Sequence, residues 1–324
     1  MITFKCARFR HVNNNQAHNK PANLNRRTDR WNPIFSASSY RGPVTRKLLS
    51  RLASRPARLM TGGKLKLSAR KFGLAPFGAL ALALSLSASS FAQATGKNLV
   101  TVRGQKQEIY YYPATGTKLN RKVLFAPGDG GWRGWAITIA QQMAGWGYDV
   151  YGLDTKTYLS GFTGGAGIKE SDVMSDFRQI AQWMTKGADE RVTLVGWSEG
   201  AGLGVLAAAG AENKRTFSGL VTFGLQDVNI LGWCWKDNLT YITKSRPNEP
   251  TFRASGYMAK IAPLPYLMIQ SSKDEYVPFD ETKMLATAAR EPKRVSIIQA
   301  INHRFDGNTG EFYKKLREGL QWMK

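Results

Sequence analysis

A serine between two glycines is the residue best placed to do chemistry in this 324-residue sequence. Residues 196–200 read Gly-Trp-Ser-Glu-Gly, after the apolar run Val192–Val195 and before a segment of small residues, Ala201–Gly210. Such a serine sits on a strained turn between strand and helix, which exposes its hydroxyl and aims the helix N-terminus at developing negative charge. Ser198 is therefore predicted to be a nucleophile in acyl transfer, with the Glu199 N–H as an oxyanion donor.

One histidine is the expected base for this serine. The sequence contains His11, His18 and His303, and the first two lie in residues 1–94, which we predict to be absent from the mature protein. His303 follows the strand-like run Val295–Ile298. A histidine on the loop after the last strand is the usual base for a serine on such an elbow, so His303 is the predicted base.

An acid is expected between the serine and the histidine in chain order, after the penultimate strand. The run Tyr266–Gln270 reads as a buried strand, and Asp274 lies closest to its end. Glu275 and Asp280 are the rival candidates. The predicted role of Asp274 is to hold the tautomer of His303 and to stabilise the imidazolium that forms during catalysis.

A glycine-rich segment follows an earlier predicted strand. Residues 127–133 read Pro-Gly-Asp-Gly-Gly-Trp-Arg, after the strand Lys122–Ala126. Glycines let the backbone approach a substrate closely, and acyl transfer needs two backbone N–H groups aimed at the oxyanion. The N–H of Asp129 or of Gly130 is therefore expected to complete the oxyanion hole, and a plain tight turn is the alternative interpretation.

Charge is concentrated in the first third of the chain. The formal net charge is +23, but residues 1–94 hold 17 lysines and arginines against a single acid, Asp29, and residues 95–324 hold 29 basic against 22 acidic residues. The later part therefore carries only +7. This distribution argues against a nucleic-acid partner, while the moderate excess suits contact with an anionic lipid surface.

The N-terminal region has the layout of an export signal. In residues 60–94 a basic stretch precedes the apolar core Leu74–Leu86, and Ala-Gln-Ala at 92–94 forms a small-x-small cleavage site. We therefore predict a mature N-terminus at Thr95 and a periplasmic location. An uncleaved membrane anchor is the alternative, although the apolar core is short for a span. Residues 1–59 are interpreted as lying outside the natural product or as a disordered basic extension.

Strands and helices alternate along residues 95–324, which predicts one domain with a mostly parallel central sheet and helices on both faces, the α/β-hydrolase fold. A hairpin is expected over Asn98–Tyr112, further strands over Tyr148–Asp154 and Gly219–Phe223, and helices over Trp135–Trp146, Glu170–Lys186 and Gly310–Met323. Gly161–Gly167 reads as a loop and Asp227–Ala262 as irregular.

Three motifs resemble the bacterial virulence family of VirJ and AcvB. They are residues 128–133, the elbow at 196–200 and Asn-His-Arg-Phe-Asp-Gly at 302–307, and the resemblance covers roughly residues 98–324. It implies a periplasmic location, hydrolysis of aminoacyl-phosphatidylglycerol, chiefly the lysyl form, for the AcvB branch, and an association with type IV secretion for the VirJ branch. Carried over, Ser198 is the nucleophile, Asp274 the acid and His303 the base.

Several side chains suit the cationic lipid ester that this resemblance implies. Asp129 and Glu199 flank the predicted oxyanion site and would pair with a substrate ammonium. Three tryptophans, Trp132, Trp233 and Trp235, are expected to contact the substrate or a bilayer interface. Plain structural roles in a turn, a helix N-terminus and the core are the alternatives, and Trp-Cys-Trp at 233–235 departs from the family pattern.

No metal or cofactor is expected, because one histidine and one cysteine in the mature chain cannot form a usual zinc site. The predicted function is a periplasmic serine hydrolase that cleaves a carboxylic ester, with an aminoacylated anionic phospholipid as the favoured substrate and peripheral contact with the membrane. A general carboxylesterase or dienelactone-type hydrolase is one alternative. A non-catalytic periplasmic accessory protein, with a protein partner in a secretion system, is the other.

Overall fold

The structure is a computed structural model that describes residues 96–163, 167–234 and 249–323. The predicted extension at 1–59, the predicted signal peptide at 60–94 and Trp235 lie outside these ranges. Within them, no helix combines the length and the apolar character needed to cross a membrane.

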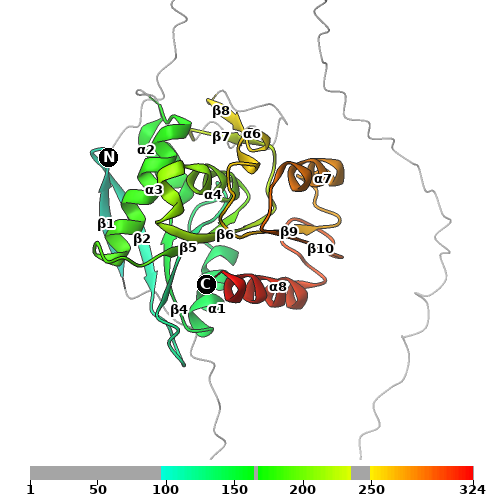
Figure 1. Cartoon of the computed structure of the whole chain (residues 1–324), viewed down its shortest axis with the longest axis horizontal. Helices are drawn as coiled ribbons and strands as arrows, with labels where there is room; N and C mark the ends of the chain where they lie inside the picture. Colours follow the sequence, from blue (N-terminus) through cyan, green and yellow to red (C-terminus); the bar gives the residue numbers. More distant parts are fainter. Residues whose placement is uncertain (1–95, 164–166, 235–248, 324) are drawn as a thin grey trace, which may run out of the picture. The chain divides into compact units, whose positions relative to one another are not determined.

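One eight-stranded sheet forms the centre of the described part of the chain, in the order β1-β2-β4-β3-β5-β6-β9-β10 (Figure 1). Its strands are β1 (Lys97–Val102), β2 (Gln105–Tyr112), β3 (Arg121–Ala126), β4 (Tyr148–Leu153), β5 (Val192–Trp197), β6 (Phe217–Phe223), β9 (Tyr266–Ser271) and β10 (Lys293–Ile298). β1 and β2 are antiparallel to their neighbours, and all later strands run parallel. The loops that follow the parallel strands therefore meet at one edge of the sheet.

Helices cover both faces of this sheet (Figure 1). One face carries α1 (Trp135–Gly145) and α8 (Thr309–Trp322), which share an apolar cluster with β3 and β6. The other face carries α2 (Thr155–Phe162), α3 (Glu170–Thr185), α4 (Glu199–Ala209), α6 (Ser255–Met258) and α7 (Phe279–Ala288). A short turn of 3₁₀ helix, η1 (Ala211–Lys214), and a small antiparallel hairpin, β7 (Val228–Ile230) with β8 (Thr251–Arg253), complete the described elements.

The predicted α/β-hydrolase fold is confirmed, with local differences. The segment Asp227–Ala262, expected to be irregular, contains β7, β8 and α6, and α2 occupies the first two residues of the expected loop Gly161–Gly167. The side chain of Asp154 caps α2 by accepting a hydrogen bond from the Thr157 N–H at 3.0 Å. These elements have three to eight residues, too few for a hydrophobic period to identify them.

Trp132 belongs to the aromatic core beneath the glycine-rich loop. Its side chain is buried, its ring stacks on Tyr110 at 5.1 Å between centroids, and its indole N–H donates to Tyr112 Oη at 3.3 Å. The ring lies against Gly152 of β4, where an added Cβ would come within 1.8 Å of it. The ring is therefore enclosed by the sheet and anchors the loop from below, and the predicted contact of Trp132 with substrate stays a prediction.

The Gly152→Ala substitution is expected to destabilise the fold by about 3 kcal/mol, because the added methyl group displaces the Trp132 ring from a packed core. Urea unfolding measures this free energy directly. Gly145→Ala is the matched control, since a Cβ at Gly145 in α1 meets nothing within 4 Å. Equal unfolding free energies for the two variants would contradict this account of the core.

Candidate active site

Ser198 lies on a strained turn between β5 and α4. Its φ of 55° and ψ of −124° are unusual for a residue with a side chain, and its backbone N–H donates to the Phe223 carbonyl at 3.0 Å. A Cβ at Gly196 would lie 2.5 Å from the Gly200 carbonyl oxygen, and one at Gly200 would lie 2.0 Å from that of Ala126. Only glycine fits on both sides, so packing forces the chain to turn at Ser198.

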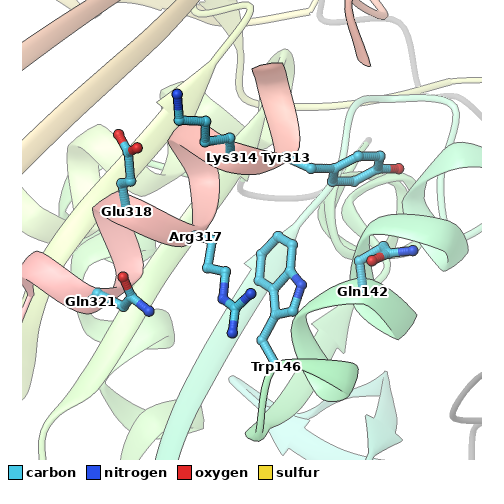
Figure 2. Close-up of a pocket in the computed structure, with 7 residues that line it drawn as sticks. All are labelled: Gln142, Trp146, Tyr313, Lys314, Arg317, Glu318 and Gln321. Atoms are coloured by element: carbon cyan, nitrogen blue, oxygen red, sulfur yellow. The ribbon is translucent and has the colours of Figure 1, made fainter. Parts of the chain in front are cut away.

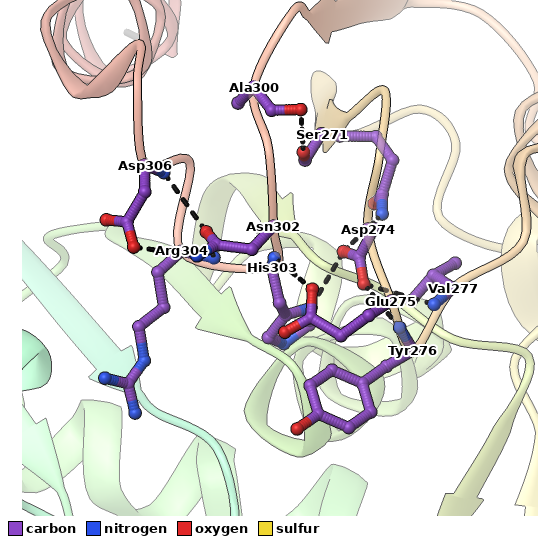
Figure 3. A network of polar contacts seen from close by, with 11 residues as sticks. Ser271, Asp274, Glu275, Tyr276, Val277, Ala300, Asn302, His303, Arg304 and Asp306 are labelled. Carbon is purple, nitrogen blue, oxygen red and sulfur yellow. Dashed lines mark hydrogen bonds and ion pairs between the residues drawn. The ribbon is translucent and has the colours of Figure 1, made fainter. Parts of the chain in front are cut away.

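His303 and Asp274 form a buried pair on the loops after β10 and β9 (Figure 3). The His303 Nδ1 and an Asp274 carboxylate oxygen are 2.7 Å apart, and the two side chains are 8% and 0% exposed. The rival acids have other partners: the Glu275 carboxylate accepts the backbone N–H of His303 at 2.7 Å, and the side chain of Asp280 is 94% exposed. Asp274 is therefore the acid that faces the imidazole.

Three donors hold the Asp274 carboxylate in place (Figure 3). One of its oxygens accepts the backbone N–H groups of Tyr276 and Val277 at 2.9 and 3.1 Å. The other accepts the Gln270 side-chain amide at 2.8 Å, besides facing His303. A fixed carboxylate places the imidazole proton on Nδ1 and leaves Nε2 free to accept a proton.

Gly224, which sequence reasoning missed, makes room for the imidazole. It follows β6 with a φ of 59°, and a Cβ there would lie 2.3 Å from His303 Cε1. The only signal in the sequence was a glycine directly after a buried strand.

Among the described residues no hydrogen bond joins Ser198 Oγ to the imidazole of His303, although both residues pack on the Phe223–Gly224 turn. Proton transfer therefore needs Oγ to move within hydrogen-bond distance of Nε2.

The glycine-rich loop after β3 passes close to Ser198. A Cβ at Gly128 would lie 3.2 Å from Ser198 Cβ and 3.6 Å from its Oγ. Burial raises the pKa of the Asp129 carboxyl group, and the neighbouring Gly130 N–H opposes that rise. The two predicted loop donors, the N–H groups of Asp129 and Gly130, stay alternatives for an oxyanion hole that includes the Glu199 N–H at the start of α4.

The carboxyl group of Asp129 in this loop affects the pKa of Glu199 at the start of α4. Glu199 is buried, and its side chain accepts hydrogen bonds from the Gln226 amide and, at 3.1 Å, from the Ile230 N–H. Burial, and then the charge of Asp129, raise the pKa of Glu199 to about 8. Burial also raises the pKa of Asp129, against nearby positive groups that include Lys156. Glu199 is therefore mainly protonated at neutral pH.

Trp233 is buried at the side of the site and already has a cation on its ring. The Nζ of Lys156 lies 4.1 Å from the Trp233 ring centroid, and the Trp233 N–H donates to Thr163 Oγ1 at 2.8 Å. Lys156 therefore supplies a cation at this ring, and the predicted contact of Trp233 with substrate stays a prediction. The predicted partner Trp235 lies outside the described residues.

A groove of about 400 Å³ lies elsewhere, between α1 and α8 (Figure 2). Trp146 and Tyr313 line it, and the guanidinium of Arg317 lies 5.9 Å from the Trp146 ring centroid. None of the predicted catalytic residues borders this groove. The candidate site is therefore defined by contacts between its residues and not by the size of a cavity.

Comparisons with solved structures place the fold. The α/β hydrolase GrgF from Penicillium sp. sh18 superposes with a TM-score of 0.55 at 12% identity, over 70% of this chain and 98% of that one. A membrane phospholipase A described as a bacterial virulence factor superposes with a TM-score of 0.50 at 16% identity, over 70% and 86%. With the strand order and the strained serine, these likenesses define an α/β-hydrolase fold.

Sequence comparison narrows the class. Residues 120–229 match the model of the family described as bacterial virulence protein (VirJ). The uncharacterized protein Rv2307c of Mycobacterium tuberculosis is 26% identical over 226 residues, which are 67% of this chain and 75% of that protein. The chain therefore has an α/β-hydrolase fold, and its residues 120–229 are similar to the VirJ family.

The Gly224→Ala substitution is expected to slow the reaction of Ser198 with a fluorophosphonate probe about a hundredfold, because the added methyl group pushes the His303 ring out of position. The rate of probe labelling measures this without a known substrate. Gly307→Ala is the matched control: Gly307 also has a positive φ, but its nearest neighbour would lie 3.8 Å from a Cβ. Equal labelling rates for the two variants would contradict the role given to Gly224.

The Glu199→Gln substitution is expected to reduce a pH dependence of stability. Since the folded pKa of about 8 lies above the ordinary 4.5, the folded protein keeps this proton longer than the unfolded chain, and its free energy of unfolding falls as pH rises between these values. Above them the penalty of the buried charge is fully present. Urea unfolding at about pH 5 and about pH 8.5 should show a loss on the order of a few kcal/mol in the wild type.

The glutamine variant should lose less over the same pH range, because its amide keeps the size of the side chain and never ionises. An identical loss in both proteins would assign the pH dependence to another group.

Proposed function

We propose that this protein is a serine hydrolase that cleaves carboxylic esters, with Ser198 as nucleophile, His303 as general base and Asp274 as the acid that orients it. The observation that carries the proposal is the buried 2.7 Å contact between His303 and Asp274 on loops that meet the Ser198 turn. A nucleophile, a base and an orienting acid together make up the set of groups that acyl transfer requires.

In the acylation step, Ser198 Oγ attacks the ester carbonyl carbon while its proton passes to His303 Nε2. The carbonyl electrons move to the oxygen, which accepts hydrogen bonds from the Glu199 N–H and from the N–H of Asp129 or Gly130. Collapse of the tetrahedral intermediate breaks the bond to the alcohol oxygen, and the imidazolium returns its proton to that oxygen. The alcohol leaves, and the acyl group remains on Ser198 as an ester.

In the deacylation step, His303 takes a proton from water, which attacks the acyl-enzyme carbonyl carbon. The second intermediate collapses with transfer of that proton to Ser198 Oγ, and the carboxylic acid leaves. The carboxylate of Asp274 stays ionised throughout and stabilises the imidazolium in both steps. The reaction therefore consumes one water and restores the starting enzyme.

The two acids beside the oxyanion site, Asp129 and Glu199, form an acidic pair that favours a cationic acyl group. A carboxylate next to a developing oxyanion opposes its charge, and this repulsion is strong where water is excluded. An ammonium bound beside the Asp129 carboxylate reverses the effect, because it pairs with that charge and attracts the oxyanion. We therefore propose an aminoacyl ester as the substrate, with the lysyl ester favoured because it brings two ammonium groups.

The location and the alcohol part of the substrate are also proposals. The export signal predicted at residues 60–94 supports a periplasmic enzyme, and the moderate positive charge of residues 95–324 suits work at an anionic membrane surface. An aminoacylated anionic phospholipid, lysyl-phosphatidylglycerol above all, satisfies both conditions. A general carboxylesterase would share the triad without needing the acidic pair.

The deciding experiment measures lysine release from lysyl-phosphatidylglycerol vesicles by the purified protein. The wild type is expected to release lysine, and Ser198→Ala to lose at least about a thousandfold in rate, because it lacks the nucleophile. Asp129→Asn should lower the preference for the lysyl ester over a short neutral ester about tenfold, because it removes one charge from the ammonium site.

Two controls are needed to interpret the result. Circular dichroism shows that the variants are folded, and a short chromogenic ester reports the triad alone. Cleavage of the short ester without lysine release would remove the lipid substrate and leave a carboxylesterase. No turnover of either ester by folded wild-type protein would favour the accessory role in secretion.

A further inference from the structure

Two cationic side chains pack on the outer side of the glycine-rich loop. The Cβ of Lys156, in the first turn of α2, would lie 3.2 Å from a Cβ at Gly131, and Nη2 of Arg133 would lie 3.6 Å from one at Gly130. Burial raises the pKa of the Asp129 carboxyl group, and both cations act against that rise, so both lie within electrostatic range of it. The carboxylate of Asp154 lies at the same part of the loop, 3.0 Å from a Cβ at Gly131, and accepts the backbone N–H groups of Trp132 and Thr157.

The side chains of Lys156 and Arg133 have N–H groups that are not used in hydrogen bonds to other described residues. Lys156 is half-buried and its ammonium lies over the Trp233 ring, a contact that occupies none of its three N–H groups, whereas Arg133 is exposed. Throughout residues 96–163, 167–234 and 249–323, the side chains of Lys156 and Arg133 form no hydrogen bond or ion pair. A partly buried ammonium without acceptors costs free energy, and an anionic ligand removes that cost.

We propose that Lys156 and Arg133 bind a phosphate group in the alcohol part of the substrate. This inference rests on the proposed function, in which an ammonium of the acyl part occupies the site between Asp129 and Glu199. With the positive charge in the acyl part, an anion beside the same loop belongs to the alcohol. The guanidinium fork binds two phosphate oxygens, and the ammonium of Lys156, held over the Trp233 ring, binds as a point charge.

The arrangement selects the order of charges along the substrate. A molecule that carries an ammonium, then the ester and then a phosphate places each charge beside its opposite. An ester with the reverse order meets repulsion at both ends, which gives discrimination by unfavourable as well as favourable contacts. Neutral alcohols leave the two cations without acceptors and gain nothing from them.

The test compares two soluble esters: the lysyl ester of glycerol 1-phosphate and the lysyl ester of glycerol. The quantity measured is the ratio of their kcat/KM values, because both esters place the same acyl group at the acidic pair. Lys156→Gln and Arg133→Gln are each expected to lower this ratio about tenfold, since each removes a charge-assisted contact to phosphate. Lysyl-phosphatidylglycerol vesicles form a second arm, and a loss that is larger with vesicles than with the soluble phosphate ester identifies the lipid headgroup as the source of the phosphate.

Lys118→Gln is the matched control. Lys118 is exposed and precedes β3, at the opposite end of the strand from the loop at 127–133, so its removal changes the net charge equally and leaves the site intact. The ratio should be unchanged in this variant. An unchanged ratio in Lys156→Gln and Arg133→Gln, or an equal fall in all three variants, overturns the phosphate site.

A binding measurement separates this inference from the proposed function. Calorimetry with glycerol 1-phosphate needs no turnover, and weaker binding by about tenfold in Lys156→Gln and Arg133→Gln supports the phosphate site even if neither lysyl ester is cleaved. That result would contradict the lysyl ester as substrate and would support the phosphate site at Lys156 and Arg133. Absence of glycerol 1-phosphate binding to the wild-type protein overturns the site, whatever the esters show.

Discussion

Close backbone approach around Ser198 is the constraint on which the rest of the site depends. Gly196 and Gly200 have no space for a side chain, and Gly128 brings the next loop to within van der Waals distance of the serine. With these contacts in place, the positive φ of Ser198 is imposed by packing, and the hydroxyl is presented where the loops after β9 and β10 also end. The glycines thus set the geometry that the acid and base use.

Burying two carboxyl groups beside the oxyanion site creates an electrostatic problem that the structure only partly resolves. Burial, and then the nearby charge of Asp129, raise the pKa of Glu199 to about 8, so its protonated form is favoured at neutral pH. The positive end of α4, Lys156 and Arg133 lie close enough to offset the charge of Asp129. A cationic acyl group would complete this balance, which is why the acidic pair, and not the triad, argues for an aminoacyl ester.

The sequence was sufficient to predict a mostly parallel sheet with helices on both faces, because long periodic segments carry their own signals. The motif framed by a strand and a helix was sufficient to propose Ser198, Asp274 and His303 as the catalytic residues, which stay a prediction. Asp274 could be preferred over Glu275 and Asp280 only from its distance to the strand end, and the structure gives each acid a different partner. Gly224 could not be found, because its function lies in a space filled by a residue 79 positions later.

The surroundings of Trp132 and Trp233 could not be predicted from the sequence. Trp132 and Trp233 follow glycines in loops, a pattern that fits a surface contact as well as a core position. The choice depended on which other segments cover them. For Trp132 that segment is β4, where Gly152 leaves room for the ring, and for Trp233 it is the start of α2, which carries Lys156. Such contacts join segments distant in sequence, and a single chain gives no signal for them.

The same packing bears on whether this protein is a catalyst or a binding scaffold. A positive φ at Ser198, a glycine pressed against the His303 ring and a buried His303–Asp274 pair each cost stability and give a binding surface nothing in return. Drift in sequence would readily replace any one of them by a more stable alternative in a protein that only binds a partner. Their presence together at one edge of the sheet is therefore an argument for chemistry.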